Sequence, residues 1–340
     1  MNPRRVSPLH IALLMWGFSF GFVPVRADKV PEVTNTIESL TPEQARKLVA
    51  EFEGDELPLN GLKTLDAKTA EALAGFKGQA LFLDGLKTLD ATTAVTLAEF
   101  NGQSLRLNGL TTLDAETAKA LGQFNGAGLY LGVLPTLDSV TAKALAEFKG
   151  RILGLNRLKK LDAGAVNVLA AKDSWNGCLH SLTTLDADTA KALVRMQKWD
   201  GCLYSLTTLD VATARALAEF KGKYLALDGL STLDADTAKT LASNDKWDGQ
   251  LSALIALDSP DSIAIAQALA ARKGRLALPS LKKISPKTLS ALIAKEDVEI
   301  PLIEALELIP EPDGSATEDF VIPEWLEERQ KQQRAAQAAE

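Results

Sequence analysis

The chain has 340 residues, of which 46% are hydrophobic and 6% aromatic, with 37 lysines and arginines against 44 aspartates and glutamates. The hydrophobic content is enough to bury a core, which excludes a disordered chain. A formal net charge of −7 gives no general electrostatic reason to bind nucleic acid, and two cysteines exclude a disulfide framework and a four-cysteine zinc cluster. We therefore expect a folded protein that does not bind nucleic acid.

Residues 1–27 have the pattern of an export signal. Arg4 and Arg5 precede an apolar run over residues 11–23, and Val25 and Ala27 satisfy the small-residue rule for a cleavage site. The run is too short to cross a bilayer as a helix, which takes about 20 apolar residues. We predict that residues 1–27 form a signal peptide, and that the mature chain is secreted or lies in the periplasm or cell envelope. No integral membrane segment is expected after its removal.

A 24-residue unit repeats through nearly all of the remaining sequence, with the consensus L-x-L-x-G-L-x-T-L-D-A-x-T-A-x-A-L-A-x-F-x-G. The leucine before the aspartate recurs at a constant spacing, as Leu65, Leu89, Leu113, Leu137, Leu161, Leu185, Leu209, Leu233 and Leu257. Leu40, Ile284 and Leu306 extend the series at slightly different spacings. The repeat predicts one elongated domain over residues 28–309, including terminal caps. Residues 310–340 are expected to be a partly disordered or helical tail.

Each unit contains two apolar periodicities in succession. Leu81 and Leu83 alternate with Phe82, as in a short strand with one buried face. The apolar residues that follow each aspartate recur with helical spacing, and Gly78 is expected to stop the first of these helices. One strand and one helix cannot bury their own apolar faces, so the units must stack, with parallel strands on one surface and helices on the other.

This leucine pattern resembles that of leucine-rich-repeat proteins over roughly residues 33–309. Leucines such as Leu62, Leu86 and Leu110 replace the inward asparagine of many family members, so we expect no asparagine ladder. The departure is similar to the bacterial surface-protein variant with L-x-L-P-x-x-L-x-x-I units, which residues 276–284 (LALPSLKKI) nearly reproduce. The resemblance implies an α/β solenoid with a concave parallel sheet and convex helices, used for binding, usually of proteins.

One aspartate in each unit directly precedes the helical pattern. Stacking would place these carboxylates about 5 Å apart, an arrangement that could hold calcium. Helix N-capping explains the same positions, and its contribution of ~1 kcal/mol per helix outweighs a repulsion of roughly 0.8 kcal/mol between neighbours in water. We therefore predict N-caps, and neither a metal nor a cofactor, at Asp66, Asp90, Asp114, Asp138, Asp162, Asp186, Asp210, Asp234 and Asp258.

The strand residues between and after the inward leucines vary from unit to unit, which marks positions that packing leaves free. Phe82, Arg106 and Tyr130 occupy equivalent positions in three successive units, and clusters of aromatic residues with arginine are typical of interfaces. His180 and Tyr204 hold the neighbouring position in two later units. We predict that these five residues bind the partner, a protein or another cell-surface macromolecule. Ordinary surface variation is the alternative.

Three units carry a tryptophan in place of the phenylalanine, three residues later in the unit, at Trp175, Trp199 and Trp247. We expect these tryptophans to replace phenylalanine in the core. The shift also predicts a helix that is longer by about one turn in these units.

Cys178, His180 and Cys202 form a cluster that could bind a metal or act as a nucleophile. The sequence offers no evident fourth metal ligand and no residue that obviously orients His180. In an exported protein, paired cysteines more often form a disulfide. Equivalent residues on adjacent strands lie about 4.8 Å apart, within disulfide range, so we predict a somewhat strained Cys178–Cys202 bridge. Two unpaired thiols are the alternative.

Together these features predict a non-enzymatic repeat protein that binds another macromolecule through its concave strand face. No catalytic, cofactor-binding or metal-binding residue is assigned. The first alternative is a cell-envelope structural or adhesive scaffold, in which the tail or the convex face makes the contacts. The second is a metal-binding or enzymatic site at Cys178, His180 and Cys202.

Overall fold

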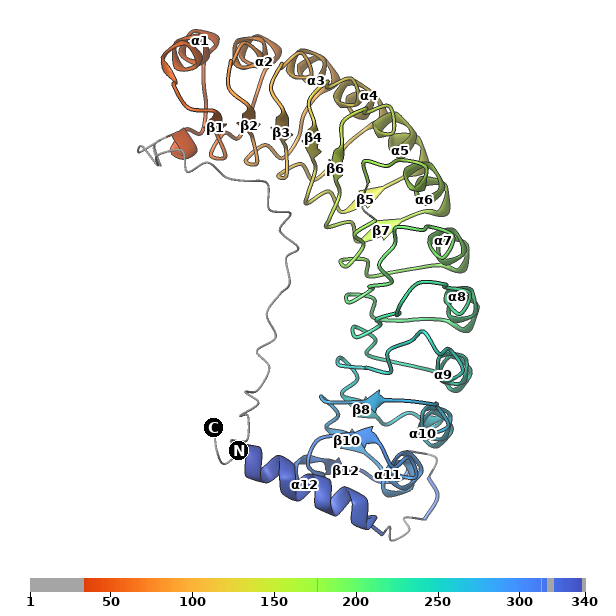
Figure 1. Cartoon of the computed structure of the whole chain (residues 1–340). Coiled ribbons are helices and arrows are strands. Elements are labelled where there is room, and N and C mark those ends of the chain that lie inside the picture. Colours follow the sequence, from red (N-terminus) through yellow and green to blue (C-terminus); the bar gives the residue numbers. More distant parts are fainter. Residues whose placement is uncertain (1–33, 176, 313, 317–320, 338–340) are drawn as a thin grey trace, which may run out of the picture.

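A computed structural model describes residues 34–337 except Asn176, Asp313 and residues 317–320. The predicted signal peptide lies outside the described residues. The described chain forms an arc of stacked units, with strands along the inner side and helices along the outer side (Figure 1). This arrangement confirms the predicted α/β solenoid, with a concave parallel sheet and convex helices.

The helices of the described chain are short and recur once per unit up to α11. They are η1 (Thr34–Thr36), α1 (Pro42–Glu51), α2 (Ala67–Ala74), α3 (Ala91–Leu97), α4 (Ala115–Gly122), α5 (Ser139–Leu145), α6 (Ala163–Ala170), α7 (Ala187–Leu193), α8 (Val211–Leu217), α9 (Ala235–Ala242), α10 (Ser262–Ala270), α11 (Pro286–Ile293), η2 (Ile303–Ala305) and α12 (Glu324–Gln337). Each helix from α1 to α10 packs against the helix of the next unit.

The strands are two or three residues long. They are β1 (Glu56–Pro58), β2 (Ala80–Phe82), β3 (Ser104–Arg106), β4 (Gly128–Tyr130), β5 (Thr136–Leu137), β6 (Ile152–Gly154), β7 (Lys160–Leu161), β8 (Ala256–Leu257), β9 (Leu276–Ala277), β10 (Lys283–Ile284), β11 (Val298–Glu299) and β12 (Glu307–Leu308). The main sheet has the order β1-β2-β3-β4-β6, and each pair is parallel with a register of one repeat. Equivalent residues of successive units therefore lie side by side.

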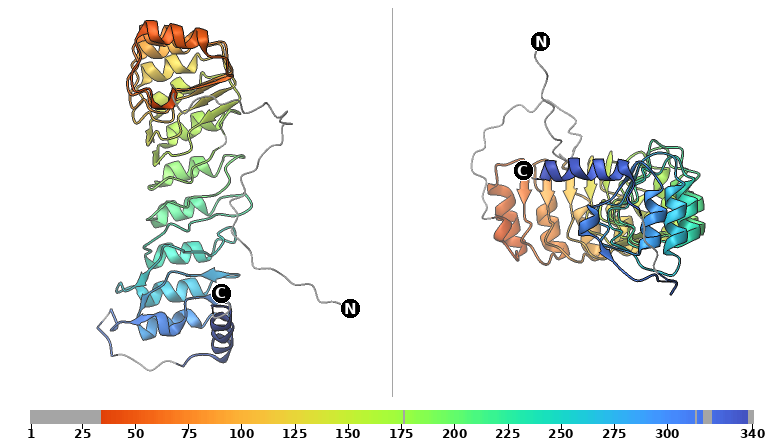
Figure 2. Two further views of the ribbon diagram at one scale, coloured as in Figure 1. Left: turned by 90° about the vertical axis from the view of Figure 1, so that its left-hand side faces the viewer. Right: turned by 90° about the horizontal axis from the view of Figure 1, so that it is seen from below.

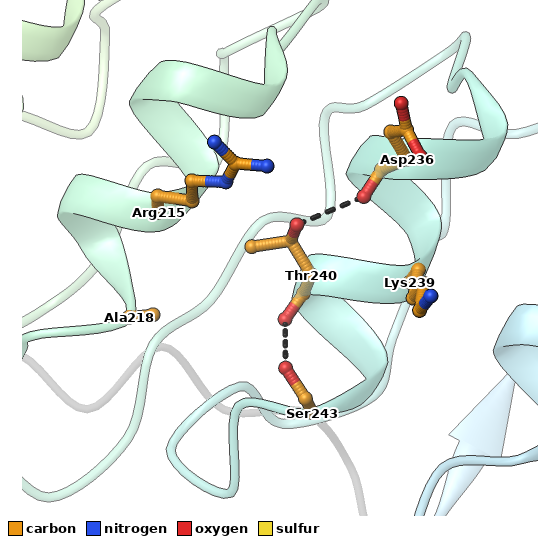
Figure 3. A pocket seen from close by; sticks show the side chains of 6 residues that line it. All are labelled: Arg215, Ala218, Asp236, Lys239, Thr240 and Ser243. Atoms are coloured by element: carbon orange, nitrogen blue, oxygen red, sulfur yellow. Dashed lines mark hydrogen bonds between the residues drawn. The ribbon is translucent and has the colours of Figure 1, made fainter.

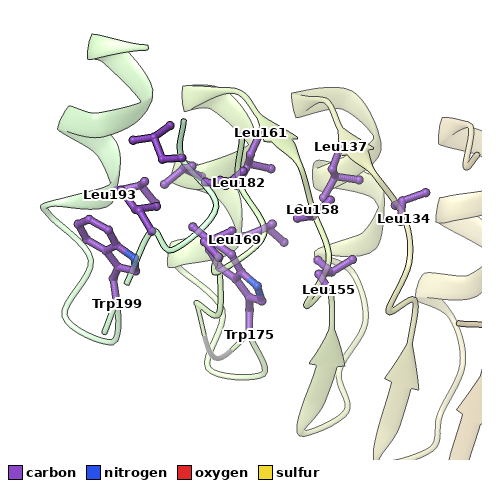
Figure 4. Close-up of a cluster of buried hydrophobic side chains, with 14 of the residues drawn as sticks. Leu134, Leu137, Leu155, Leu158, Leu161, Leu169, Trp175, Leu182, Leu193 and Trp199 are labelled. Carbon is purple, nitrogen blue, oxygen red and sulfur yellow. The ribbon is translucent and has the colours of Figure 1, made fainter. Parts of the chain in front are cut away.

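The core is a continuous column of inward leucines, alanines and aromatic rings. Leu81 and Leu83 are fully buried, as predicted. The rings of Phe76, Phe100, Phe124 and Phe148 stack with centroids 6.2–6.3 Å apart. Trp175, Trp199 and Trp247 are at most 4% exposed, which confirms that they take the place of phenylalanine in the core, and Figure 4 shows Trp175 and Trp199 among the leucines.

The units that carry these tryptophans do not have longer helices. Helices α6, α7 and α9 have 8, 7 and 8 residues, like α2 and α3 with 8 and 7. The prediction of an additional helical turn is therefore wrong. The additional residues form turns between the helix and the tryptophan, for example at residues 171–174. The wider indole ring occupies its core position from this longer loop.

The aspartate column forms helix N-caps, as predicted, in all units but one. The side chain accepts a hydrogen bond from the backbone N–H three residues on at Asp66, Asp90, Asp114, Asp138, Asp162, Asp186, Asp210 and Asp234. The prediction is wrong for Asp258, because Ser259 and Pro260 intervene and α10 begins only at Ser262.

Gly78 does not stop the first repeat helix, since α2 ends at Ala74 with Gly75 as its C-cap. A Cβ atom at Gly78 would lie 2.3 Å from the ring of Phe76 and 2.6 Å from the carbonyl oxygen of Asp55. The glycine is therefore needed for close packing of the ring against the backbone.

Helix α12 packs across the C-terminal end of the arc (Figure 2). Leu326 is buried within the core, and Arg329 donates a hydrogen bond to the carbonyl of Val298. Arg334 forms a bidentate ion pair with Glu304, with N–O distances of 2.7 Å. The helix thus covers apolar surface that the last unit would otherwise expose.

Candidate functional site

The first candidate surface is the cluster of Phe82, Arg106 and Tyr130 on the concave face. These residues end β2, β3 and β4, and the parallel register pairs Phe82 with Arg106 and Arg106 with Tyr130. The Arg106 guanidinium lies 4.6 Å from the centroid of the Phe82 ring, within range of a cation–π contact. The structure therefore confirms the predicted adjacency of these three residues.

Arg106 is also bound to the neighbouring column of side chains. Its Nη2 donates a hydrogen bond of 3.1 Å to Oδ2 of Asp84, and the side chains of Arg106 and Asp84 are 40% and 22% exposed. The Nε atom of Arg106 is buried and has no hydrogen-bond partner among the described residues. The guanidinium is therefore held between Phe82 and Asp84, and the bond to Asp84 uses only one of its N–H donors.

A ladder of side-chain oxygens runs beside this cluster. The backbone N–H of Asn60 donates to the side-chain oxygen of Asn35, that of Asp84 to Asn60, that of Asn108 to Asp84, and that of Gly132 to Asn108. The inward positions for which no asparagine ladder was expected hold the buried leucines Leu62, Leu86 and Leu110, so this ladder is a different one. The ladder forms at the residue directly after L-x-L, which varies between units and was therefore expected to have no structural role. Asn and Asp can alternate there because both supply a side-chain oxygen that accepts the hydrogen bond.

The second candidate surface contains Cys178, His180 and Asp200. His180 Nε2 donates to Asp200 Oδ2 over 2.7 Å, and one ligand atom from each of the three residues lies within 4.8 Å of the others. The second oxygen of Asp200 accepts a hydrogen bond of 3.0 Å from the backbone N–H of Cys202. Asp200 thus orients His180, a role for which the sequence showed no obvious residue.

Loop geometry explains why Asp200 escaped the sequence analysis. It lies 20 residues after His180, between Trp199 and Gly201, and not in the strand position of the repeat. Gly177 and Gly201 have φ angles of 72° and 79°, a left-handed conformation that glycine adopts without strain. The recurrence of Trp-Asp-Gly was the available signal, but the direction of the carboxylate depends on this turn.

The remaining side chains around this surface are two tyrosines and Cys202. The Sγ atom of Cys202 lies 3.1 Å from Tyr204 Oη and 3.8 Å from Tyr224 Oη, and the Tyr204 ring contacts the His180 ring edge-on. The hydrogen bond to Cys202, followed by burial, raises the pKa of Tyr204. His180 and Tyr204 were both predicted to bind a partner. They belong to a cluster separate from that of Phe82, Arg106 and Tyr130.

Both thiols in this surface are shifted toward their neutral forms. Burial, followed by the negative charges of Asp200 and Cys202, raises the pKa of Cys178. Burial is also the largest cause of the raised pKa of Cys202. A thiolate nucleophile is therefore disfavoured here at neutral pH.

The predicted disulfide is not formed in the structure, where Cys202 is a free cysteine. Side chains at equivalent positions of parallel units point the same way, which opposes the torsion of a disulfide. Cys202 instead directs its sulfur at Tyr204. The Cys178–Cys202 bridge stays a prediction for the oxidised protein.

On the helical side of the arc, a hollow of about 450 Å³ lies between α8 and α9 (Figure 3). Thr240 and Ser243 line it, and each donates its hydroxyl to a backbone carbonyl of α9 over 2.8 Å. These hydroxyl protons are used within the helix, so the hollow is a weaker candidate than the concave surfaces. Within the described part of the chain, no helix combines the length and the apolar character needed to cross a bilayer.

No family model and no curated protein matches the chain. Among solved structures, it is similar to the TLR13 chain of the TLR13–ssRNA13 complex, at 16% identity and a TM-score of 0.29, over 79% of this chain and 33% of that one. It is also similar to an internalin (InlF) of Listeria monocytogenes strain 4b F2365, at 12% identity and a TM-score of 0.36, over 84% and 90%. The chain spans about a third of the length of the TLR13 chain.

The architecture follows from the chain itself. Helices alternate with parallel strands, and the register of the main sheet equals one repeat. The protein is therefore an α/β repeat protein with a leucine-rich-repeat-like fold.

Proposed function

We propose that this protein binds another protein through Phe82, Arg106 and Tyr130 on its concave face and has no enzymatic activity. The observation that carries the proposal is the placement of these three side chains on adjacent strands, with Arg106 packed on Phe82. Aromatic residues and arginine dominate the energetic centres of protein interfaces. All three are half-buried, so they combine a fixed position with an accessible surface.

Arg106 is positioned before a partner arrives. The contacts with Phe82 and Asp84 restrict the rotation of its side chain, so less conformational entropy is lost on binding. A guanidinium has five N–H donors, and the bond to Asp84 uses one of them. Nε is buried, so the remaining Nη donors are the ones that favour a protein segment with a carboxylate or a backbone carbonyl beside an apolar side chain.

The proposal also includes the finer features of the sequence. The signal-like residues 1–27 support export, with residues 28–309 as the solenoid and 310–340 as the tail. The LALPSLKKI segment supports membership of the 24-residue bacterial surface-protein type. A cell-envelope scaffold is the alternative function, and it would use the convex face or the tail.

Capture of partners with variant proteins tests this proposal. The parent chain and the variant Phe82→Ala/Arg106→Ala/Tyr130→Ala are immobilised and exposed to envelope and extracellular fractions of the source cells. The variant should fold as the parent does, because none of the three side chains replaces an inward leucine. We expect a protein that is retained by the parent and lost with the triple variant.

The matched control places three alanines on the convex side, with Val95→Ala, Lys119→Ala and Lys143→Ala at exposed helix positions. This control should retain the partner. Retention by the concave variant together with loss by the convex variant would replace the proposal with the scaffold function.

A further inference from the structure

The cluster of Cys178, His180 and Asp200 offers three different metal-binding groups at one place. A thiol, an imidazole and a carboxylate each contribute one atom, and these atoms lie within 4.8 Å of one another. In a tetrahedral zinc site with bonds of 2.0–2.3 Å, ligand atoms lie about 3.3–3.8 Å apart. Closing the cluster around an ion therefore needs movements of about 1 Å, which side-chain rotation can supply.

We propose that Cys178, His180 and Asp200 bind one zinc ion, with a fourth coordination position left to water. The mixture of sulfur, nitrogen and oxygen ligands suits zinc and does not suit calcium or magnesium, which prefer oxygen alone. This site is separate from Phe82, Arg106 and Tyr130, so it goes beyond the proposed binding function.

The surroundings hold the ligands in place. The backbone N–H of Cys202 holds the other oxygen of Asp200, and the ring of Tyr204 contacts the ring of His180 edge-on with centroids 5.2 Å apart. Such contacts orient ligand side chains in known metal sites. On zinc binding, Asp200 Oδ2 exchanges its hydrogen bond to His180 for a bond to the metal, and the neutral imidazole supplies a nitrogen lone pair.

The charges around the cluster favour a cation over a nucleophilic thiolate. The Asp200 carboxylate and a Cys178 thiolate would both be negative, with ligand atoms within 4.8 Å of each other, so a divalent ion between them offsets their repulsion. Zinc binding converts the Cys178 thiol to a zinc-bound thiolate and releases one proton to solvent.

An ion can reach the cluster from solvent. The side chains of His180 and Asp200 are 44% and 40% exposed, and Cys178 is half-buried. Two repeats further on, Asp248 occupies the position of Asp200, and the unit before it has Ala226 and Asp228 in place of Cys178 and His180. That unit lacks the thiol and the imidazole, so it serves as an internal control.

Titration of the reduced, purified full chain with zinc and with cobalt tests the proposal. We expect one zinc ion per chain, release of one proton at neutral pH, and a cobalt–thiolate charge-transfer absorption. Cys178→Ser, His180→Gln and Asp200→Asn should each weaken zinc binding by at least about tenfold. Cys178→Ser should also abolish the charge-transfer absorption.

The control variants are Cys202→Ser and Asp248→Asn, and both should retain the stoichiometry and the affinity of the parent. Circular dichroism and thermal melting verify that each variant is folded. The absence of a charge-transfer absorption in the parent, or unchanged zinc affinity in a folded Cys178→Ser variant, would overturn the proposal. Equal loss of affinity in Asp248→Asn or Cys202→Ser would overturn the assignment of the ligands.

Discussion

Arg106 donates a hydrogen bond of 3.1 Å to Asp84, across the boundary between neighbouring repeats. The other carboxylate oxygen of Asp84 accepts the backbone N–H of Asn108 at 2.9 Å. One side chain therefore orients the arginine of the proposed binding surface and also connects the backbones of two units. Stability and binding are coupled at this residue, and two different substitutions can separate them.

Asp84→Asn keeps the oxygen that accepts from Asn108 but removes the charge that holds Arg106. We expect stability to urea within about 0.5 kcal/mol of the parent, together with weaker binding of the captured partner. Asp84→Ala also loses the ladder bond and should cost about 0.5–1.5 kcal/mol more. Equal urea midpoints for the two variants would show that the ladder does not stabilise the solenoid.

Leu121 is fully buried on the inner side of α4, whereas Lys119 is exposed on the same helix. Leu121→Ala should lower the free energy of unfolding by ~2–5 kcal/mol, because the cavity it leaves lies between stacked units. Lys119→Ala should change it by less than about 0.5 kcal/mol. Denaturant unfolding of both variants checks this, and a similar cost for the two would contradict the assigned faces of the helix.

Helix caps should make stability depend on acid pH. The hydrogen bond from the backbone N–H of Thr93 lowers the pKa of Asp90 from its usual 3.8. Since the folded pKa is the lower one, the carboxylate's contribution is fully present above pH ~4–5 and is lost as pH falls through 3.8 and the folded pKa. Asp90→Ala should therefore cost ~1 kcal/mol at pH 7 and progressively less in acid.

Asp90→Asn is the matched variant, because asparagine also caps helices but does not titrate. Its stability relative to Asp90→Ala should not change between pH 7 and pH 3. Urea unfolding at several pH values measures both differences. A cost of Asp90→Ala that stays constant down to pH 3 would contradict the role of the charged cap.

The two cysteines connect oxidation with the proposed zinc site. If Cys178 and Cys202 are bridged in the exported protein, the bridge removes the Cys178 thiolate, and oxidised protein should bind no zinc until it is reduced. Alkylation of denatured protein without reductant, followed by intact-mass measurement, shows whether the two cysteines are thiols or a disulfide. Two added alkyl groups mean free thiols, in which case the bridge is absent and zinc binding should be full without reductant.

The repeat pattern was sufficient to predict the solenoid, the register of its parallel strands and its buried core. Because the repeat has a constant length, every unit packs against its neighbours in the same way. The alternation of apolar residues around Leu81 and their helical spacing after Asp66 were therefore sufficient to place strands, helices and most caps. Local hydrogen bonds such as that of Asp90 to the N–H of Thr93 span three residues and can be read from spacing alone. For the same reason, the adjacency of Phe82 and Arg106 followed from the 24-residue period.

The contacts between polar side chains of different units could be identified only in the folded chain. The bond between Asp200 and His180 depends on a turn at Gly201, and the bond between Asp84 and Arg106 depends on side-chain rotation within the face. The burial of Leu326 likewise depends on where α12 packs after a break in the repeat. These contacts arise from loop conformations and rotamers that differ between units, whereas a repeat pattern carries only what all units have in common.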